Sequence, residues 1–286
     1  MIHRPKNLAE YSGQSKAKRL IEIYLKDKEQ FPHTIITGKA GQGKSSLAYI
    51  IANSINKKFF EFIASSITSD KIIELTNKYP NCVIFLDEVH SMDRKEVEKI
   101  YSLMEDFTVS GKSFNKFTLL GATTEVGELL KDRRPFFERF KLCIDLEDYE
   151  VDDIETIVSN YDLRLNSGSN WIAKEALNII AKWCRYNPRT AIKMYDIYKR
   201  TGSTEDVANI FDIKYSNGYT KKDEKLIKYL SSNKVSGIQG ICSYLDINQD
   251  YYLNELEPLL LRDNIIVRTP RGRKLSEIGI ELASKI

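Results

Sequence analysis

Cysteine, histidine and long apolar runs are all scarce in this chain of 286 residues. Its 4 Cys are widely scattered without a CxxC pair and are accompanied by only 3 His, which argues against a zinc site or a disulfide framework. No apolar run approaches the roughly 20 residues that cross a bilayer, and the N-terminus lacks the apolar stretch of a signal peptide. These absences argue against secretion and membrane insertion and predict a cytoplasmic protein.

An excess of one charge is also missing. The 43 Lys and Arg residues nearly balance the 40 Asp and Glu residues, which leaves a formal charge of +3. This balance neither requires nor excludes nucleic acid, so any basic surface must come from local clustering. The hydrophobic share of 42% is ample for a core, and the length predicts two or three domains.

Short apolar runs alternate with helical patterns through the first half of the chain. The runs that predict strands are 34–37, 59–64, 82–86, 116–122 and 142–146. Helix-capable sequence separates them, most clearly at 17–25 and 44–55. Strands that alternate with helices predict an α/β fold with a parallel sheet covered on both faces.

The second half has a different pattern, because strands stop after about residue 149. Helical spacing recurs at 150–160, 170–184, 188–200, 223–231, 238–245 and 249–261. The polar stretch 216–222 is typical of a linker. A β-capable segment at 265–268, a Pro-Arg-Gly-Arg turn and a final helix complete the outline of a winged helix.

Residues 38–45 read Gly-Lys-Ala-Gly-Gln-Gly-Lys-Ser and fit the phosphate-loop pattern GxxxxGK[ST], with a predicted strand before it and a helix after it. Glycines let backbone N–H groups surround phosphate oxygens, and the helix directs its positive end at the same place. Lys44 is expected to reach the β- and γ-phosphates, and the Ser45 hydroxyl to bind Mg²⁺. The residues predicted to hold the nucleotide here are Gly41, Gly43, Lys44, Ser45 and Ser46.

A second motif follows, in which the apolar run 83–86 ends in Asp87 and Glu88. Ligands of open α/β sheets bind at the carboxyl ends of the strands. Asp87 is therefore a candidate to hold Mg²⁺, and Glu88 to orient and polarise the attacking water of ATP hydrolysis. An isolated match would more simply be a strand that ends in an acidic turn, but the preceding phosphate loop favours the catalytic interpretation.

Together the two motifs resemble the AAA+ ATPases, and further segments resemble the RuvB family of Holliday-junction branch-migration motors. In the family's order these segments are 4–6, 10–14, 87–90, 104–107, 117–124, 187–189, 256–258 and 268–273. The resemblance implies a ring, most simply a hexamer, that hydrolyses ATP and moves double-stranded DNA at four-way junctions. It implies three domains: an AAA+ ATPase domain over 1–148, a small helical lid over 149–217 and a winged helix over 218–286.

The resemblance also assigns roles to single residues. Thr124 matches the polar sensor that senses the γ-phosphate through the attacking water, although it could be an ordinary threonine at a strand end. Arg139 matches the arginine finger that reaches a neighbouring subunit's nucleotide, with Arg133 and Arg134 as nearby rivals. Arg189 matches the second sensor, which would couple nucleotide state to rotation of the lid.

Two further matches are single residues near the expected nucleotide. Arg4 and Tyr149 match positions that flank the adenine and the domain hinge. Without the resemblance, they would be a surface charge and a packing residue.

Basic residues concentrate in the C-terminal segment, where 262–274 holds five basic residues and one acidic residue. A cationic turn of this kind suits phosphate contacts and carries no chemistry that reads bases. By resemblance to the family's winged helix, the predicted DNA contacts are Arg268, Arg271 and Arg273, with weak sequence preference. A basic turn without that context would be ordinary solvated surface.

The chain departs from the family pattern in three places. The phosphate loop lacks two prolines that the family has after its first glycine, which predicts a looser loop. Only nine residues separate Phe107 from Phe117, where the family has a longer hairpin that docks the partner RuvA. This argues against RuvA binding or implies a different adaptor. Phe137 stands where the family often has a second arginine.

Two other functions fit parts of the pattern. A loader that places a helicase or clamp on DNA would share the ATPase motifs, but the winged-helix outline opposes it. A DNA-binding regulator that nucleotide only switches would not need Glu88 and Arg139.

Overall fold

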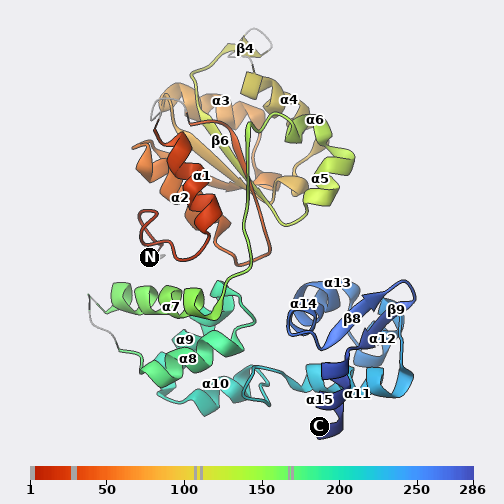
Figure 1. Cartoon of the computed structure of the whole chain (residues 1–286). Helices are drawn as coiled ribbons and strands as arrows, with labels where there is room; N and C mark the ends of the chain where they lie inside the picture. The colour runs from red at the N-terminus through yellow and green to blue at the C-terminus, as the bar shows by residue number, and fades with distance from the viewer. Residues whose placement is uncertain (1–3, 27–30, 106–107, 110–111, 167, 169–170) are drawn as a thin grey trace. The chain divides into compact units, whose positions relative to one another are not determined.

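The computed structural model describes residues 4–26, 31–105, 108–109, 112–166, 168 and 171–286. Residues 106–107, 110–111 and 170, which fall in segments named above, lie outside the described part. The chain forms two compact units, Met1–Ile172 with Tyr186–Ile192 and Ala173–Arg185 with Lys193–Ile286, which we call the first and second units (Figure 1). These divisions do not test the three predicted domains, which stay a prediction. Among the described helices, none combines the length and apolar character needed to cross a membrane.

A five-stranded parallel sheet lies at the centre of the first unit, with strand order β2-β3-β6-β1-β7. Its strands are β1 (Thr34–Thr37), β2 (Phe59–Ile63), β3 (Val83–Asp87), β6 (Thr118–Thr123) and β7 (Leu142–Asp145). The predicted α/β fold is therefore confirmed. Strand β6 begins two residues later than predicted, because the Lys116 carbonyl accepts a hydrogen bond from the Asn81 N–H in a loop.

Helices cover both faces of this sheet, as predicted. They are α1 (Ser15–Tyr24), α2 (Lys44–Ser54), α3 (Ser69–Lys78), α4 (Arg94–Glu105), α5 (Val126–Asp132) and α6 (Arg134–Phe137), with 3₁₀ turns η1 (Ala64–Ser66) and η2 (Val89–Ser91). Alternate strand residues point to opposite faces. Val83 and Phe85 accordingly pack in the core beneath α1 and α2, while Ile84 and Leu86 pack in the core beneath α3 and α4.

The short insertion before β6 forms an antiparallel pair of two-residue strands, β4 (Thr108–Val109) and β5 (Lys112–Ser113). In this pair Thr108 faces Ser113 and Val109 faces Lys112. The insertion is thus a minimal hairpin.

Three of the predicted helices follow the sheet. They are α7 (Val151–Leu165), α8 (Lys174–Trp183) and α9 (Pro188–Thr201). A fourth helix, α10 (Thr204–Ile210), follows them and was not predicted from the sequence. Helix α7 belongs to the first unit and begins with a capping box between Glu150 and Asp153. Helix α8 belongs to the second unit, and α9 begins in the first and continues in the second.

The C-terminal part of the second unit is a winged helix, as predicted. Its elements are α11 (Lys221–Asn233), α12 (Ile238–Leu245), α13 (Gln249–Tyr251), the π-helical turn η3 (Tyr252–Leu256), α14 (Glu257–Arg262), β8 (Ile266–Thr269), β9 (Gly272–Leu275) and α15 (Glu277–Lys285). Strands β8 and β9 pair antiparallel, with Thr269 opposite Gly272. The wing therefore turns through Pro270 and Arg271 alone.

Two sequence predictions in this region are wrong in part. The linker predicted over 216–222 ends early, because Tyr219 is buried and Thr220 caps α11 through the Asp223 N–H. The helix predicted over 249–261 is interrupted by the turn η3. Pro258 has no N–H to donate to the preceding turn, and a widened turn satisfies the helix there.

Candidate functional site

The phosphate loop joins β1 to α2, and its backbone has the shape that the sequence predicts. Gly38, Gly41 and Gly43 have φ of 149°, 83° and 94°, values that residues with side chains adopt only at a cost. Helix α2 begins directly at Lys44. Its unpaired N–H groups and the positive end of its dipole therefore face the loop, which is the arrangement that binds phosphate.

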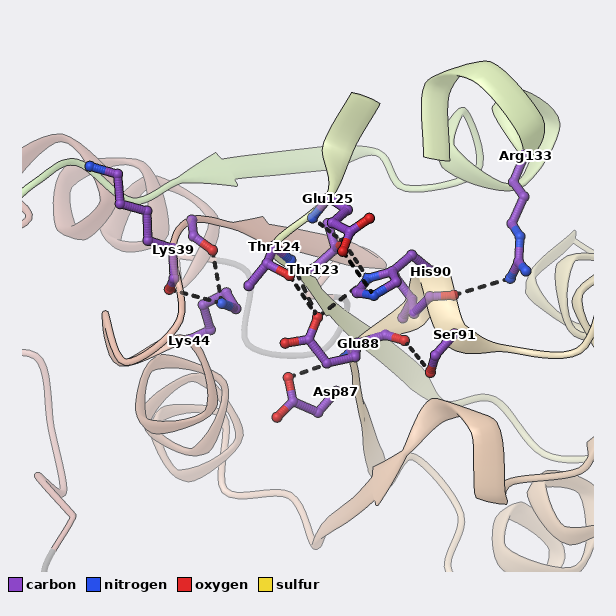
Figure 2. Close-up of polar contacts among 12 residues, drawn as sticks. Lys39, Lys44, Asp87, Glu88, His90, Ser91, Thr123, Thr124, Glu125 and Arg133 are labelled. Atoms are coloured by element: carbon purple, nitrogen blue, oxygen red, sulfur yellow. Dashed lines mark hydrogen bonds and ion pairs between the residues drawn. The ribbon is translucent and has the colours of Figure 1, made fainter. Parts of the chain in front are cut away.

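Lys44 is almost fully buried beneath this loop, and its Nζ donates to the carbonyls of Gly38 (2.8 Å) and Lys39 (3.1 Å). Figure 2 shows its ammonium group turned back onto these carbonyls. Burial lowers the pKa of Lys44, while the nearby Glu88 and Asp87 partly offset that effect. The charge is thus desolvated and has weak partners that a phosphate oxygen can replace.

Side chains also brace the loop from outside. Gln42 is buried, and its Oε1 accepts from the Lys39 N–H (2.7 Å) while its Nε2 donates to Asp148 Oδ1 (2.9 Å). Lys39 Nζ lies 2.7 and 2.6 Å from the two Asp148 carboxylate oxygens. The prediction of a looser loop overlooked these bonds, and one of them uses a backbone N–H at position 39 that a proline would lack.

Tyr149 lies under the same loop rather than at its rim. Its buried Oη donates to the Gln42 carbonyl (2.9 Å), and the Tyr11 hydroxyl approaches the carbonyls of Gln42 (3.3 Å) and Gly43 (3.4 Å). Burial raises the pKa of both phenols, so they stay protonated and able to donate.

Arg4 makes a bidentate ion pair with Glu61 of β2, at 2.8 and 3.0 Å. Ser45 and Ser46 occupy the first turn of α2, on the loop side. Their roles toward a nucleotide stay predictions.

The acidic pair lies at the carboxyl end of β3, as predicted. Asp87 is partly buried, and burial followed by the charge of Glu88 raises its pKa. Glu88 has a left-handed backbone with φ of 53°. Strand β3 pairs with β6, so Thr124 lies beside Glu88 and donates to its Oε2 from Oγ1 (3.2 Å) and, more weakly, from N (3.4 Å).

The donor set suits Mg²⁺ better than a transition metal. Ser45 and Asp87 offer oxygen ligands, and no cluster of three or more His, Cys, Asp or Glu side chains able to hold a metal occurs among the described residues. Mg²⁺ needs only one or two protein ligands because water and phosphate oxygens complete its shell. The raised pKa of Asp87 reflects crowded negative charge that a cation would neutralise.

The three candidate finger arginines have different surroundings. Arg133 Nη1 donates to the Val89 carbonyl (3.3 Å), and Arg134 pairs with Glu138 just after its own helix (2.8 Å). Arg139 Nε lies 2.7 Å from Glu105 Oε1, and its guanidinium lies over the Tyr101 ring at 5.5 Å.

Arg139 also lines a hollow of about 1060 Å³ together with His33, Lys141 and Tyr24. His33 precedes β1 and Lys141 precedes β7, so this hollow lies at the amino-terminal edge of the sheet. The phosphate loop follows β1 at the opposite edge. Arg139 is thus remote from the phosphate loop of its own chain.

Arg189 lies near the phosphate loop within the first unit. It is exposed at the start of α9, and its charge lowers the pKa of Lys44 as a minor contribution after burial. The neighbouring Asn187 donates from Nδ2 to the Ala40 carbonyl at 2.9 Å. A side chain at Gly41 would meet Asn187 Oδ1 at 2.4 Å, so the loop approaches this segment closely.

The three arginines of the wing differ in their exposure to solvent. Arg271 is exposed at the tip, Arg268 is 58% exposed and Arg273 is only 14% exposed. Arg268 Nη2 and Arg273 Nε each lie 2.6 Å from one oxygen of Glu257, which is fully buried. Burial alone would raise the pKa of the Glu257 carboxyl, but hydrogen bonds from Arg273 and Arg268 outweigh it and hold the pKa below its usual value.

Comparison with known proteins agrees with both the phosphate-loop site and the C-terminal winged helix. Residues 3–146 match the Holliday junction DNA helicase RuvB P-loop domain, and residues 216–284 match the RuvB C-terminal winged helix domain. The chain belongs to the RuvB family.

Relatives in this family align over almost their whole length. The Holliday junction branch migration complex subunit RuvB of Mycoplasmopsis pulmonis is 32% identical over 99% of this chain and 98% of its own. That of Mycoplasma pneumoniae is 30% identical over 97% and 96%. The solved Thermotoga maritima RuvB Holliday junction branch migration motor is 26% identical, covers 98% of both chains and superposes with a TM-score of 0.79.

Several residues of this RuvB-family site escaped prediction. His90 was noted only as part of a motif, yet its Nδ1 lies 3.3 Å from Glu88 Oε2. Gln42 and Asp148 carry no local signal, because their contact depends on β7 lying beside β1. The same holds for Glu257, whose partners lie on a separate hairpin.

Proposed function

We propose that this RuvB-family chain is an ATP-driven DNA motor that moves Holliday junctions by branch migration in recombination and repair. The observation that carries this is the meeting of Lys44, the Asp87–Glu88 pair and Thr124 at one edge of the sheet, in a chain that also ends in a winged helix. Its curated relatives are named as subunits of the Holliday junction branch migration complex. We propose that the protein acts in the cytoplasm.

The ATPase roles follow from the chemistry of each group. Backbone N–H groups at Gly41 and Gly43, with the hydroxyl of Ser46, bind phosphate, and Lys44 exchanges its two carbonyl partners for the β- and γ-phosphates. Ser45 and Asp87 would hold Mg²⁺, which would supply positive charge to neutralise the phosphates. Glu88 orients and polarises the attacking water, and Thr124 senses the γ-phosphate through that water.

Arg139 acts in trans in this proposal. Its place at the amino-terminal edge of the sheet, opposite the phosphate loop, supports contact with a neighbouring subunit's nucleotide rather than with its own. Activity would then depend on assembly with a neighbouring subunit, and a hexameric ring is our proposal for the assembly.

Arg189 serves as the second sensor, since its segment already contacts the loop through Asn187. It would transmit nucleotide state to rotation of the helical lid, which we place over 149–217 between an ATPase domain over 1–148 and a winged helix over 218–286. Arg4 and Tyr149 border the nucleotide, Tyr149 by supporting the loop from beneath.

Double-stranded DNA is held by the wing. Arg271 at its tip and the half-exposed Arg268 are best placed for phosphates, and Arg273 contributes chiefly by keeping the wing in position. The minimal β4–β5 hairpin supports a ring that works without a RuvA-like adaptor or with a different one.

A steady-state ATPase assay with and without duplex DNA tests the enzymatic part. We expect sustained turnover that duplex DNA stimulates, and a Glu88→Gln variant that binds ATP but hydrolyses it at least about a hundredfold more slowly. Binding of ATP without turnover by the wild-type chain would instead show a nucleotide-switched regulator. Turnover of Glu88→Gln at the wild-type rate would show that Glu88 does not activate the attacking water.

A further inference from the structure

Side chains from two elements approach the Glu88 carboxylate. Its Oε2 receives the Thr124 hydroxyl at 3.2 Å and lies 3.3 Å from His90 Nδ1 in the turn η2. Figure 2 shows the Thr124 and His90 side chains converging on this oxygen from the end of β6 and from η2. The proposed catalytic base is thus oriented by side chains on both sides.

The His90 ring is itself fixed against β6. Its Nδ1 lies 3.0 Å from Thr123 Oγ1, and Thr123 is fully buried. Its Nε2 lies 3.8 Å from Glu125 Oε1, and its side chain is 18% exposed. Arg133 holds the same turn through the Val89 carbonyl. Because these contacts fix the His90 ring, the ring can orient the neighbouring Glu88 carboxylate.

The tautomer with its hydrogen on Nδ1 lets the His90 ring donate toward Glu88 Oε2. A bare ring nitrogen 3.3 Å from a carboxylate oxygen would oppose two lone pairs, which is unfavourable at partial burial. The same nitrogen lies 3.0 Å from Thr123 Oγ1, which also accepts from the Glu125 N–H at 2.9 Å.

The Thr124 hydroxyl has one hydrogen, and in this structure it points to Glu88. If Thr124 turns this hydrogen to the attacking water, as proposed above, the hydrogen leaves the carboxylate. Among the described residues, the weak Thr124 N–H contact (3.4 Å) and His90 Nδ1 then remain beside this oxygen. Without His90, only that weak backbone contact would orient Glu88 toward the water.

We propose that His90 is a positioning residue, which keeps the Glu88 carboxylate directed at the attacking water while the Thr124 hydroxyl turns to that water. This inference rests on the proposed ATPase function. It does not require His90 to touch the nucleotide, so its effect falls on kcat rather than on the KM for ATP.

Three substitutions separate positioning from packing. An asparagine amide can occupy the place of Nδ1, whereas a glutamine amide reaches the place of Nε2. We expect His90→Ala to lower kcat about tenfold with little change in KM, as for the loss of one hydrogen bond to a charged group. His90→Asn should recover most of kcat, and His90→Gln should not.

The matched control is Ser91→Ala in the same turn, which removes a hydrogen bond to the Glu88 backbone carbonyl (2.8 Å) and leaves the carboxylate untouched. We expect its kcat to stay near the wild-type value. Melting temperatures identify any variant that fails to fold. If His90→Ala unfolds, the comparison of kcat between His90→Asn and His90→Gln still tests the positioning role.

Wild type and Glu88→Gln run in the same assay keep the two proposals apart. An inactive wild type contradicts the ATPase function itself. An active wild type with an inactive Glu88→Gln and a fully active His90→Ala contradicts only the positioning role. Equal loss in the Asn and Gln variants, or a raised KM at unchanged kcat, also overturns it.

Discussion

Arg139 lies at the sheet edge opposite the phosphate loop of its own chain, and local contacts hold it there. Glu105 pairs with its Nε, and the Tyr101 ring lies against its guanidinium. The side chain is still one-third exposed, so a neighbouring subunit can reach it. A phosphate would have to compete with the Glu105 carboxylate, so in our proposal the role of this arginine depends on assembly of the ring.

Mixed rings test the placement of this arginine. Arg139→Ala should bind ATP but fail to hydrolyse it, because the charge that develops on the phosphoryl group is not neutralised. Mixing it with Glu88→Gln subunits should restore measurable ATPase activity, since one variant supplies Glu88 and the other supplies Arg139 at the same interface.

Neither variant is active alone if the finger acts in trans. Normal turnover of purified Arg139→Ala rings would exclude Arg139 as the finger. Inactive rings in every mixture would show that the arginine serves its own subunit.

Local motifs identified part of the site and missed its supports. Lys44, Asp87 and Glu88 follow from adjacent residues, because the strand, loop and helix that place them are contiguous in sequence. Gln42 depends on Asp148, which lies 106 residues later. Only the pairing of β1 with β7 brings them together, and a single sequence carries no signal for that pairing.

At the scale of elements, two of the arginines that we propose as DNA contacts also support the wing itself. Arg268 and Arg273 from the hairpin converge on Glu257 at the start of α14, which ties the β8–β9 hairpin to the helix. The lowered pKa of Glu257 means that this stabilisation is present at neutral pH and is lost as the pH falls through the folded-state pKa. The basic count of this segment predicted a cationic wing but not that a buried acid organises it.

Two wing variants should therefore behave differently. Arg271→Ala should weaken duplex binding about fivefold and reduce the slope of log K against log salt by about 1, with an unchanged melting temperature. Arg273→Ala should also cost about 2 kcal/mol of unfolding free energy, because it leaves the buried Glu257 short of a partner.

Fluorescence anisotropy with labelled duplex over a salt series measures the first effect, and thermal melting measures the second. Lys285→Ala on α15 is the control, since that lysine pairs with Glu281 away from the wing. Equal DNA affinity of Arg271→Ala and wild type at every salt concentration would show that the tip of the wing does not contact DNA.

At the scale of the whole molecule, the sequence predicted the α/β class because short apolar runs alternate with helices. The order β2-β3-β6-β1-β7 did not follow from that alternation, since it depends on which strands pair across long separations. The interrupted helix at Pro258 and the early end of the linker at Tyr219 were missed for a related reason. In both places tertiary packing decides the local conformation.

A motor, a loader and a nucleotide switch share much of this chemistry and differ in what they do to DNA. The loader was expected to lack the winged helix that the structure contains. What separates a motor is conversion of ATP hydrolysis into movement of DNA arms through the ring.

Dissociation of a synthetic four-way junction into duplexes measures that conversion most directly. We expect the wild-type chain, assembled as rings by sedimentation, to dissociate the junction when ATP is present and not when a non-hydrolysable analogue replaces it. Glu88→Gln rings should leave the junction intact. Brisk ATPase activity without junction dissociation, with or without an added junction-binding protein, would contradict the branch-migration motor.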